Sequence, residues 1–152
     1  AQAVEELEDV HLVVRFRPFP ELTVSDLQKL IPFSRKVTLH TEGSLGKIMG
    51  AADLIVSFSS TAIEESIQNR IPVLLYGAEG RYQHLPAREV SSANSLAAPA
   101  AVYAVKKREE LAQGLSQILN LPAGWIVSPE LFAPYIFPDT DIVPLWQWTE
   151  RK

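Results

Sequence analysis

The sequence predicts an α/β domain in which a parallel, Rossmann-like sheet carries helices on both faces. Up to about residue 120, short runs of β-branched and aromatic residues alternate with amphipathic segments. The inner runs are almost wholly apolar, which is typical of parallel strands that helices cover on both sides. The length of 152 residues suits one domain of ordinary size.

The first half of the chain predicts two strand–helix pairs. His11–Arg17 is a strand of apolar and β-branched residues that prolines follow. Thr23–Leu30 is a short helix, and Thr23 with Asp26 forms a capping box. Val37–His40 is the second strand, and Ser44–Ala51 is a helix with one apolar face.

The second half predicts three more strands and two helices. Leu54–Phe58 is a nearly all-apolar strand, and the helix Thr61–Asn69 follows it with an expected capping box from Thr61 to Glu64. Pro72–Tyr76 and Val102–Val105 are buried strands. The amphipathic helix Arg108–Leu119 ends the regular part, which we assign as a domain over residues 1–120.

Residues 121–152 change character and are assigned as a Pro- and aromatic-rich extension. They hold five of the eleven prolines and all three tryptophans, Trp125, Trp146 and Trp148. Dense proline argues against a long helix, and dense aromatic residues argue against a free tail. We expect Trp125 to fold back on the domain, and we expect Trp146 and Trp148 to contact a second copy of the chain or to be partly exposed. Asp139–Asp141 resembles a metal motif of another fold, but we expect an exposed turn and no metal there.

Composition excludes several functions. The net charge of −4 argues against nucleic-acid binding, and the absence of cysteine excludes disulfides and thiol catalysis. No apolar run approaches the ~20 residues of a membrane-spanning helix. Because the first residue is Ala1 rather than Met, we expect a fragment or a processed product of a longer protein.

The turn Ser59–Ser60–Thr61 is the main candidate site. It joins a buried strand to the start of a helix, where backbone N–H groups and the helix dipole favour a phosphate or diphosphate. Glu64 and Glu65 follow on that helix, where a carboxylate can accept a hydrogen bond from a ribose hydroxyl. The alternative is that the hydroxyl residues only cap the helix.

The stretch from Ala52 to Val73 resembles the nucleotide-sugar-binding segment of the GT-B glycosyltransferase superfamily. The shared order is Ala52-Asp53, then Ser59-Ser60-Thr61, Glu64-Glu65 and Pro72-Val73. Relatives with this order include bacterial sugar-nucleotide 2-epimerases, the N-acetylglucosaminyltransferase of lipid II synthesis, and capsule or teichoic-acid polymer transferases. The resemblance covers roughly residues 10–120, but the turn lacks the glycines that most of these families have.

The resemblance implies roles for single residues. Glu65 takes the ribose-binding position in the epimerase-like pattern and Glu64 in the teichoic-acid pattern; we prefer Glu65 because its spacing to Pro72 fits. The loop at Thr41 and Glu42 would hold the base through backbone groups. Arg17 stands where the polymer transferases have a histidine, and it would pair with a phosphate rather than transfer a proton.

The resemblance also implies a function. The chain would be the donor-binding half of a GT-B-like glycosyltransferase of bacterial surface-polysaccharide synthesis, with a nucleotide-diphosphate sugar as substrate, no further cofactor and a cytoplasmic location. It would lack the N-terminal acceptor domain and its own first βα unit, and its catalytic residues are unknown. Three points stay open: peripheral membrane association, a non-catalytic partner-binding domain, and half of a sugar-nucleotide 2-epimerase.

Overall fold

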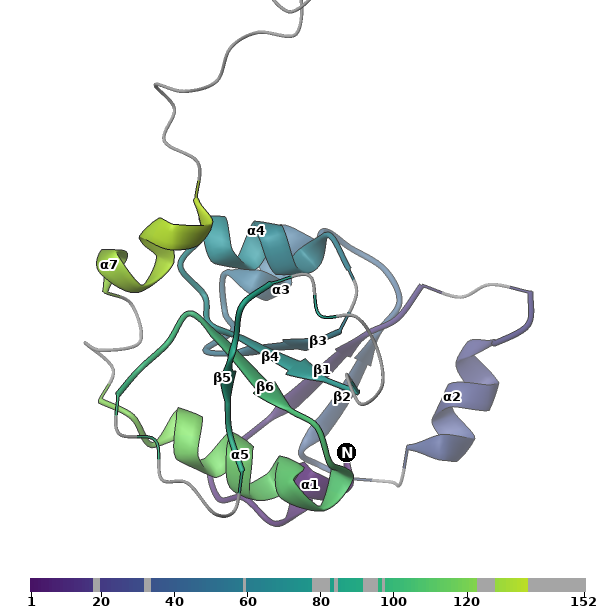
Figure 1. Ribbon diagram of the computed structural model, residues 1–152. Helices are drawn as coiled ribbons and strands as arrows, with labels where there is room; N and C mark the ends of the chain where they lie inside the picture. Colours follow the sequence, from purple (N-terminus) through teal and green to yellow (C-terminus); the bar gives the residue numbers. More distant parts are fainter. Residues whose placement is uncertain are drawn as a thin grey trace, which may run out of the picture.

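Parallel strands and helices on both of their faces confirm the expected α/β class (Figure 1). The computed structural model describes residues 1–17, 20–31, 34–58, 60–77, 83, 85–91, 96, 98–122 and 128–136. The strands are β1 (Leu12–Arg15), β2 (Val37–His40), β3 (Ile55–Ser57), β4 (Val73–Tyr76), β5 (Arg88–Glu89) and β6 (Val102–Val105). The helices are α1 (Gln2–Glu5), α2 (Val24–Leu30), α3 (Leu45–Met49), α4 (Ala62–Gln68), α5 (Leu111–Leu119) and α7 (Pro129–Phe132), with 3₁₀ turns η1 (Arg108–Glu110) and η2 (Ala133–Tyr135).

The five expected strands are all present, but they form two hydrogen-bonded groups rather than one sheet. One group is the parallel pair β1–β2, with Leu12 opposite Val37. The other is a parallel sheet in the order β3-β4-β6-β5, with Ile55 opposite Val73. Figure 1 shows the two groups following one another with a continuous twist.

Two apolar clusters hold the helices on the four-stranded sheet. On one side α4 packs through Ile63 and Ile67 against Val73 and Leu75. On the other side α5 packs through Leu115 and Ile118, together with the wholly buried Tyr103. Figure 1 accordingly shows α3 and α4 on one face, and α1 and α5 on the other. Burial of this apolar surface from both sides explains why the inner strands read as continuous apolar runs.

The helix α2 begins as the sequence predicts. The Thr23 hydroxyl accepts from the Asp26 N–H at 3.2 Å, and Asp26 accepts from the Thr23 N–H at 3.1 Å, so the expected capping box is confirmed. Hydrogen bonds from Thr23 also lower the pKa of the Asp26 carboxyl below its ordinary value. The helix buries none of its residues fully, and Leu30 at its end is 73% exposed.

Among the described residues, the sequence does not predict α1, β5, α7 or the 3₁₀ turn η2. The two-residue strand β5 lies inside the stretch 77–99, which has no clear periodicity, and pairs with β6. The helix α7 lies in the Pro-rich extension, where Ser128 precedes it and Pro129 occupies its first turn. Proline is favourable at that position because the first helical N–H has no partner within the helix.

Residues 128–136 fold back on the chain's own core. Phe132 is completely buried in the cluster with Ile63 and Val73. The Tyr135 hydroxyl donates to the Pro86 carbonyl at 2.8 Å, and burial raises the pKa of this phenol. The expectations for Trp125, Trp146, Trp148 and Asp139–Asp141 concern residues outside the described part of the chain.

Gly114 allows α5 to approach β6 closely. A Cβ atom at Gly114 would lie 2.8 Å from the Val105 Cγ2 atom, which is closer than real Cβ contacts come. We therefore expect Gly114→Ala to lower the free energy of unfolding by about 1–3 kcal/mol, although alanine favours helices. Urea denaturation measures this change.

The matched control for Gly114 is Gly46 in α3. A Cβ atom there would meet only the Ser44 Oγ atom at 3.6 Å, an ordinary contact. Gly46→Ala should therefore stabilise the protein by about 0.5–1 kcal/mol. Equal effects of the two substitutions would show that the close approach of α5 to β6 does not exist in solution.

Candidate functional site

The candidate residues gather at the carboxyl ends of three parallel strands. Arg17 follows β1, Thr41 and Glu42 follow β2, and Ser60 and Thr61 follow β3. All are exposed except Thr41, which is half-buried. Because β1 and β2 are parallel neighbours, the topology brings the segments that follow them together, whereas Ser60 and Thr61 follow a strand of the other group. Ser59, which we also predict to belong to the site, lies outside the described residues.

The β3–α4 turn differs from the predicted capping arrangement. Thr61 is the N-cap residue, but its φ of −59° and ψ of −16° are helical and its side chain makes no cap hydrogen bond. The predicted capping box between Thr61 and Glu64 is therefore wrong, since a capping side chain needs an extended backbone to reach back to the helix. Ser60 does the capping instead: its hydroxyl accepts from the Ala62 N–H at 3.2 Å.

Ser60 thus occupies two of the backbone N–H groups that were expected to bind an anion. The Ala62 N–H binds the Ser60 hydroxyl, and the Ile63 N–H binds the Ser60 carbonyl at 3.0 Å. A bound diphosphate would have to replace the Ser60 hydroxyl as the acceptor of the Ala62 N–H. The Thr61 hydroxyl is exposed and makes no cap bond, so it is available as a donor to a ligand.

The two glutamates differ in direction around α4. Ile63, Ser66 and Ile67 are buried against the sheet, whereas Glu64 and Glu65 are exposed. Successive helical residues are 100° apart, so Glu65 lies nearly opposite the buried face and Glu64 lies on the flank of the helix. Only one of the two can face a ligand bound at the start of α4.

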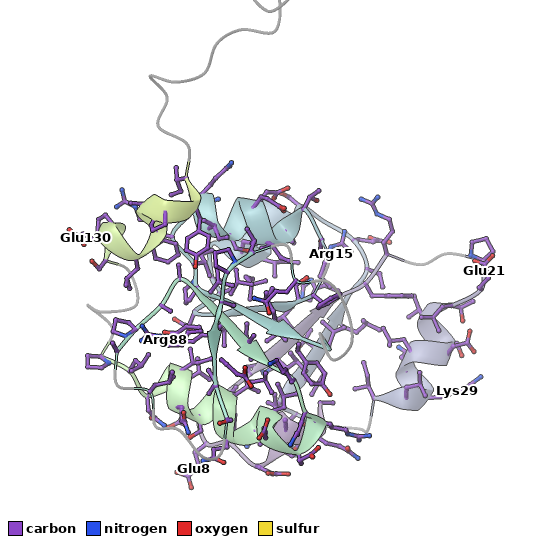
Figure 2. The ribbon with its side chains drawn as sticks, in the orientation of Figure 1. Glu8, Arg15, Glu21, Lys29, Arg88 and Glu130 are labelled. Atoms are coloured by element: carbon purple, nitrogen blue, oxygen red, sulfur yellow. The ribbon has the colours of Figure 1, made fainter. Side chains whose placement is uncertain are left out.

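Arg15 supports the loop between β2 and α3. Its guanidinium donates to the His40 carbonyl at 3.2 Å and to the Gly43 carbonyl at 3.3 Å. Gly43 has a φ of 85°, a conformation that glycine adopts without strain. Figure 2 shows Arg15 at the end of β1. The contacts brace the loop that contains Thr41 and Glu42, and Arg17 beyond them is exposed.

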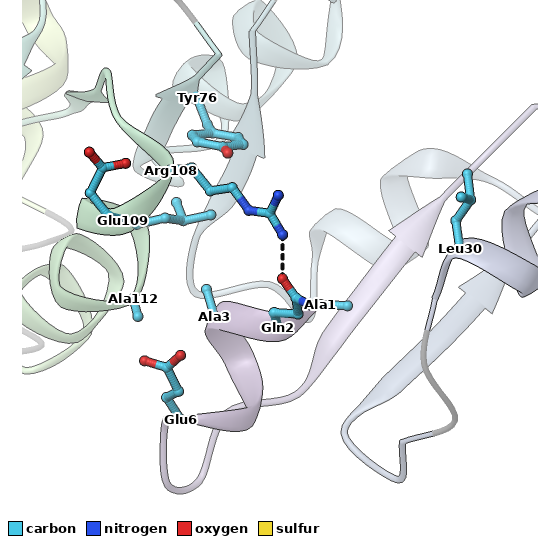
Figure 3. Close-up of a pocket in the computed structure, with 10 residues that line it drawn as sticks. Ala1, Gln2, Ala3, Glu6, Leu30, Tyr76, Arg108, Glu109 and Ala112 are labelled. Carbon is cyan, nitrogen blue, oxygen red and sulfur yellow. Dashed lines mark hydrogen bonds between the residues drawn. The ribbon is translucent and has the colours of Figure 1, made fainter.

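A cavity that the sequence did not indicate lies beside this edge. It has a volume of about 550 Å³, and it is lined by α1, the end of α2, the end of β4 and the start of α5 (Figure 3). Tyr76 and Leu30 lie at its wall, and the Arg108 guanidinium donates there to the Gln2 side chain. No sequence signal indicates this cavity, because the sequence pattern does not predict α1, which contributes Gln2.

Within the described part of the chain, no three His, Asp or Glu side chains come together in a way that could hold a metal ion. Among the same residues, no helix has the length and apolarity needed to cross a membrane. Searches among protein families, curated proteins and solved structures find no match to this chain.

Proposed function

We propose that the chain binds a nucleoside diphosphate at the carboxyl edge of its strands, as the donor-binding half of a GT-B-like glycosyltransferase. One observation carries the proposal: Arg17, Thr41 and Ser60–Thr61 directly follow the carboxyl ends of three parallel-paired strands, β1, β2 and β3. In open α/β sheets, ligands bind at the carboxyl ends of the strands. The site lies at the topological switch point, where the order of successive strands reverses. Here that reversal would fall between the pair β1–β2 and the sheet β3-β4-β6-β5, which do not pair with one another among the described residues.

Different groups at these strand ends suit the phosphates, the ribose and the base of such a ligand. Hydroxyl groups of Ser60 and Thr61 donate to phosphate oxygens, and Arg17 offsets their charge. The first turn of α4 also presents a positive dipole end. One of the carboxylates Glu64 and Glu65 accepts from the ribose, and the loop braced by Arg15 contacts the base.

The wider proposal follows from the resemblance. The donor would be a nucleotide-diphosphate sugar, the product a surface-polysaccharide intermediate, and the location cytoplasmic. The chain's own residues would bind and orient the donor and stabilise the departing diphosphate. A separate acceptor domain would complete the enzyme.

The assignment of the ribose carboxylate is tested by paired substitutions on α4. Glu65→Ala should weaken binding of uridine or cytidine diphosphate by about 1–3 kcal/mol, roughly 5- to 150-fold in Kd, because the ribose loses a charged acceptor. Glu64→Ala should change Kd little. Isothermal titration calorimetry of both variants and the unchanged chain measures this.

The reverse order of effects would assign the ribose to Glu64 and support the teichoic-acid pattern. If neither nucleotide binds the unchanged chain, the donor-site proposal is wrong. The engagement of Ala62 and Ile63 by Ser60 would then be ordinary helix capping in a non-catalytic, partner-binding domain.

A further inference from the structure

The two groups of strands present unpaired edges to one another. In β1, the N–H groups of Leu12 and Phe16 bind the Lys36 and His40 carbonyls at 2.7 and 3.0 Å. Since alternate residues of a strand bond to opposite sides, the backbone groups of Val13 point away from β2. Figures 1 and 3 show β1 on the side of β2 that is nearer to the four-stranded sheet, so this edge faces β3.

The facing edge belongs to β3. The Ile55 N–H binds the Pro72 carbonyl at 3.0 Å, which directs the backbone groups of Val56 away from β4. Within the described residues, no strand pairing joins β1 to β3. We call the space between these two edges the strand gap.

Apolar side chains are exposed beside the strand gap. Val13 is 39% and Val56 is 42% exposed, although each is the middle of a strand that neighbours a buried core. Val56 points to the same face as Leu54, which packs against the α5 cluster. That face also carries the cavity of about 550 Å³, which extends from Tyr76 at the end of β4 to Leu30 after β1 (Figure 3). The cavity therefore reaches from the end of β4 to the end of α2.

The course of residues 1–7 indicates in which direction a strand that fills the gap would run. Gln2 binds Arg108, which follows the carboxyl end of β6. The carbonyl groups of Glu5 and Leu7 bind the Lys36 side chain, which precedes the amino end of β2. Residues 1–7 thus return from the carboxyl edge to the amino edge, where β1 begins. A return of this kind is the course that the connecting segment of a β-α-β unit takes.

We infer that the strand gap receives one further parallel strand, an extended apolar segment of about four residues joined by a short loop to the amino-terminal side of Ala1. It would pair with β1 and β3 at once and make the two groups a continuous sheet. A covalently attached strand fits better than a second copy, because β1 and β3 flank the gap and an intermolecular strand would have to enter between two strands of a folded domain. Because the strand is attached to the same chain, its effective concentration at the strand gap is also high.

The inference is tested by adding a strand before Ala1. The sequence Thr-Val-Ile-Val-Thr-Gly-Ser-Gly is attached to the complete chain, and a second version carries Leu-Val-Leu in place of Val-Ile-Val. The control extension has Pro-Lys in place of Ile-Val, since proline removes a ladder donor and lysine is disfavoured inside a sheet. Amide hydrogen exchange at Val13 and Val56 is measured by NMR, and light scattering reports the oligomeric state.

At least one apolar extension should slow exchange at both Val13 and Val56 by about tenfold or more, in a monomer, because both amides gain hydrogen-bond partners. The control extension should leave both rates unchanged. Equal rates with all extensions would overturn the inference. Protection that appears only together with a dimer would also overturn it, and would assign the strand gap to a second copy. The test uses no nucleotide, so its outcome is independent of the proposed function.

Discussion

Phe132→Ala should lower the free energy of unfolding by about 3–5 kcal/mol, the largest effect we expect of a single substitution in the described part of the chain. Phe132 is the last residue of α7, and it is completely buried in the core cluster that contains Ile63 and Val73. Its truncation removes aromatic surface from the core and leaves a cavity that the rigid sheet cannot fill by collapse. Guanidinium denaturation followed by circular dichroism measures the change.

The control for Phe132 is the neighbouring exposed residue Ala133. Ala133→Ser should change stability by less than about 0.5 kcal/mol. If Phe132→Ala also costs less than about 1 kcal/mol, residues 128–136 do not complete the core in solution. The segment would then be free to dock on a partner.

Ile63→Ala should lower the free energy of unfolding by about 2–5 kcal/mol, because Ile63 attaches α4 to the sheet. Its side chain is wholly buried, and its N–H closes the turn that contains Ser60. The helix α4 carries both candidate carboxylates, so its packing also positions the candidate site. Thermal unfolding, with a shift of about 2–4 °C per kcal/mol for a chain of this size, provides the measurement.

Ile63→Val is the matched substitution, since it keeps the shape and removes one methylene. It should cost only about 0.5–1.5 kcal/mol. An effect of Ile63→Ala as small as that of Ile63→Val would show that α4 is not fixed on the sheet as described.

The strands and the larger helices could be predicted because their physical signals are local. Apolar runs such as Val73–Tyr76 and the periodic pattern of Leu111–Leu119 read directly as buried strand and amphipathic helix. The capping box at Thr23 is equally local. Helix and strand ends differ by one or two residues from the predictions, as expected where hydrogen bonding frays.

Other features depend on contacts that are distant in sequence. Strand β5 is two exposed residues, and only its pairing with β6 makes it a strand. At α4, Thr61 and Ser60 are both good capping residues, and the backbone conformation of Thr61 decides between them. The break between β1 and β3 leaves no mark in composition or periodicity, because each strand is locally regular.

The proposed nucleotide site is tested most directly by adding uridine diphosphate to the ¹⁵N-labelled chain and following its amide signals by NMR. The largest shifts should fall on Thr41, Ser60 and Thr61 together, because the proposed ligand contacts the segments that follow β2 and β3. Signals of Arg88 and Glu89 in β5 should not move. Absence of any shift at millimolar nucleotide, or shifts confined to residues away from the carboxyl ends of β2 and β3, would contradict the proposal.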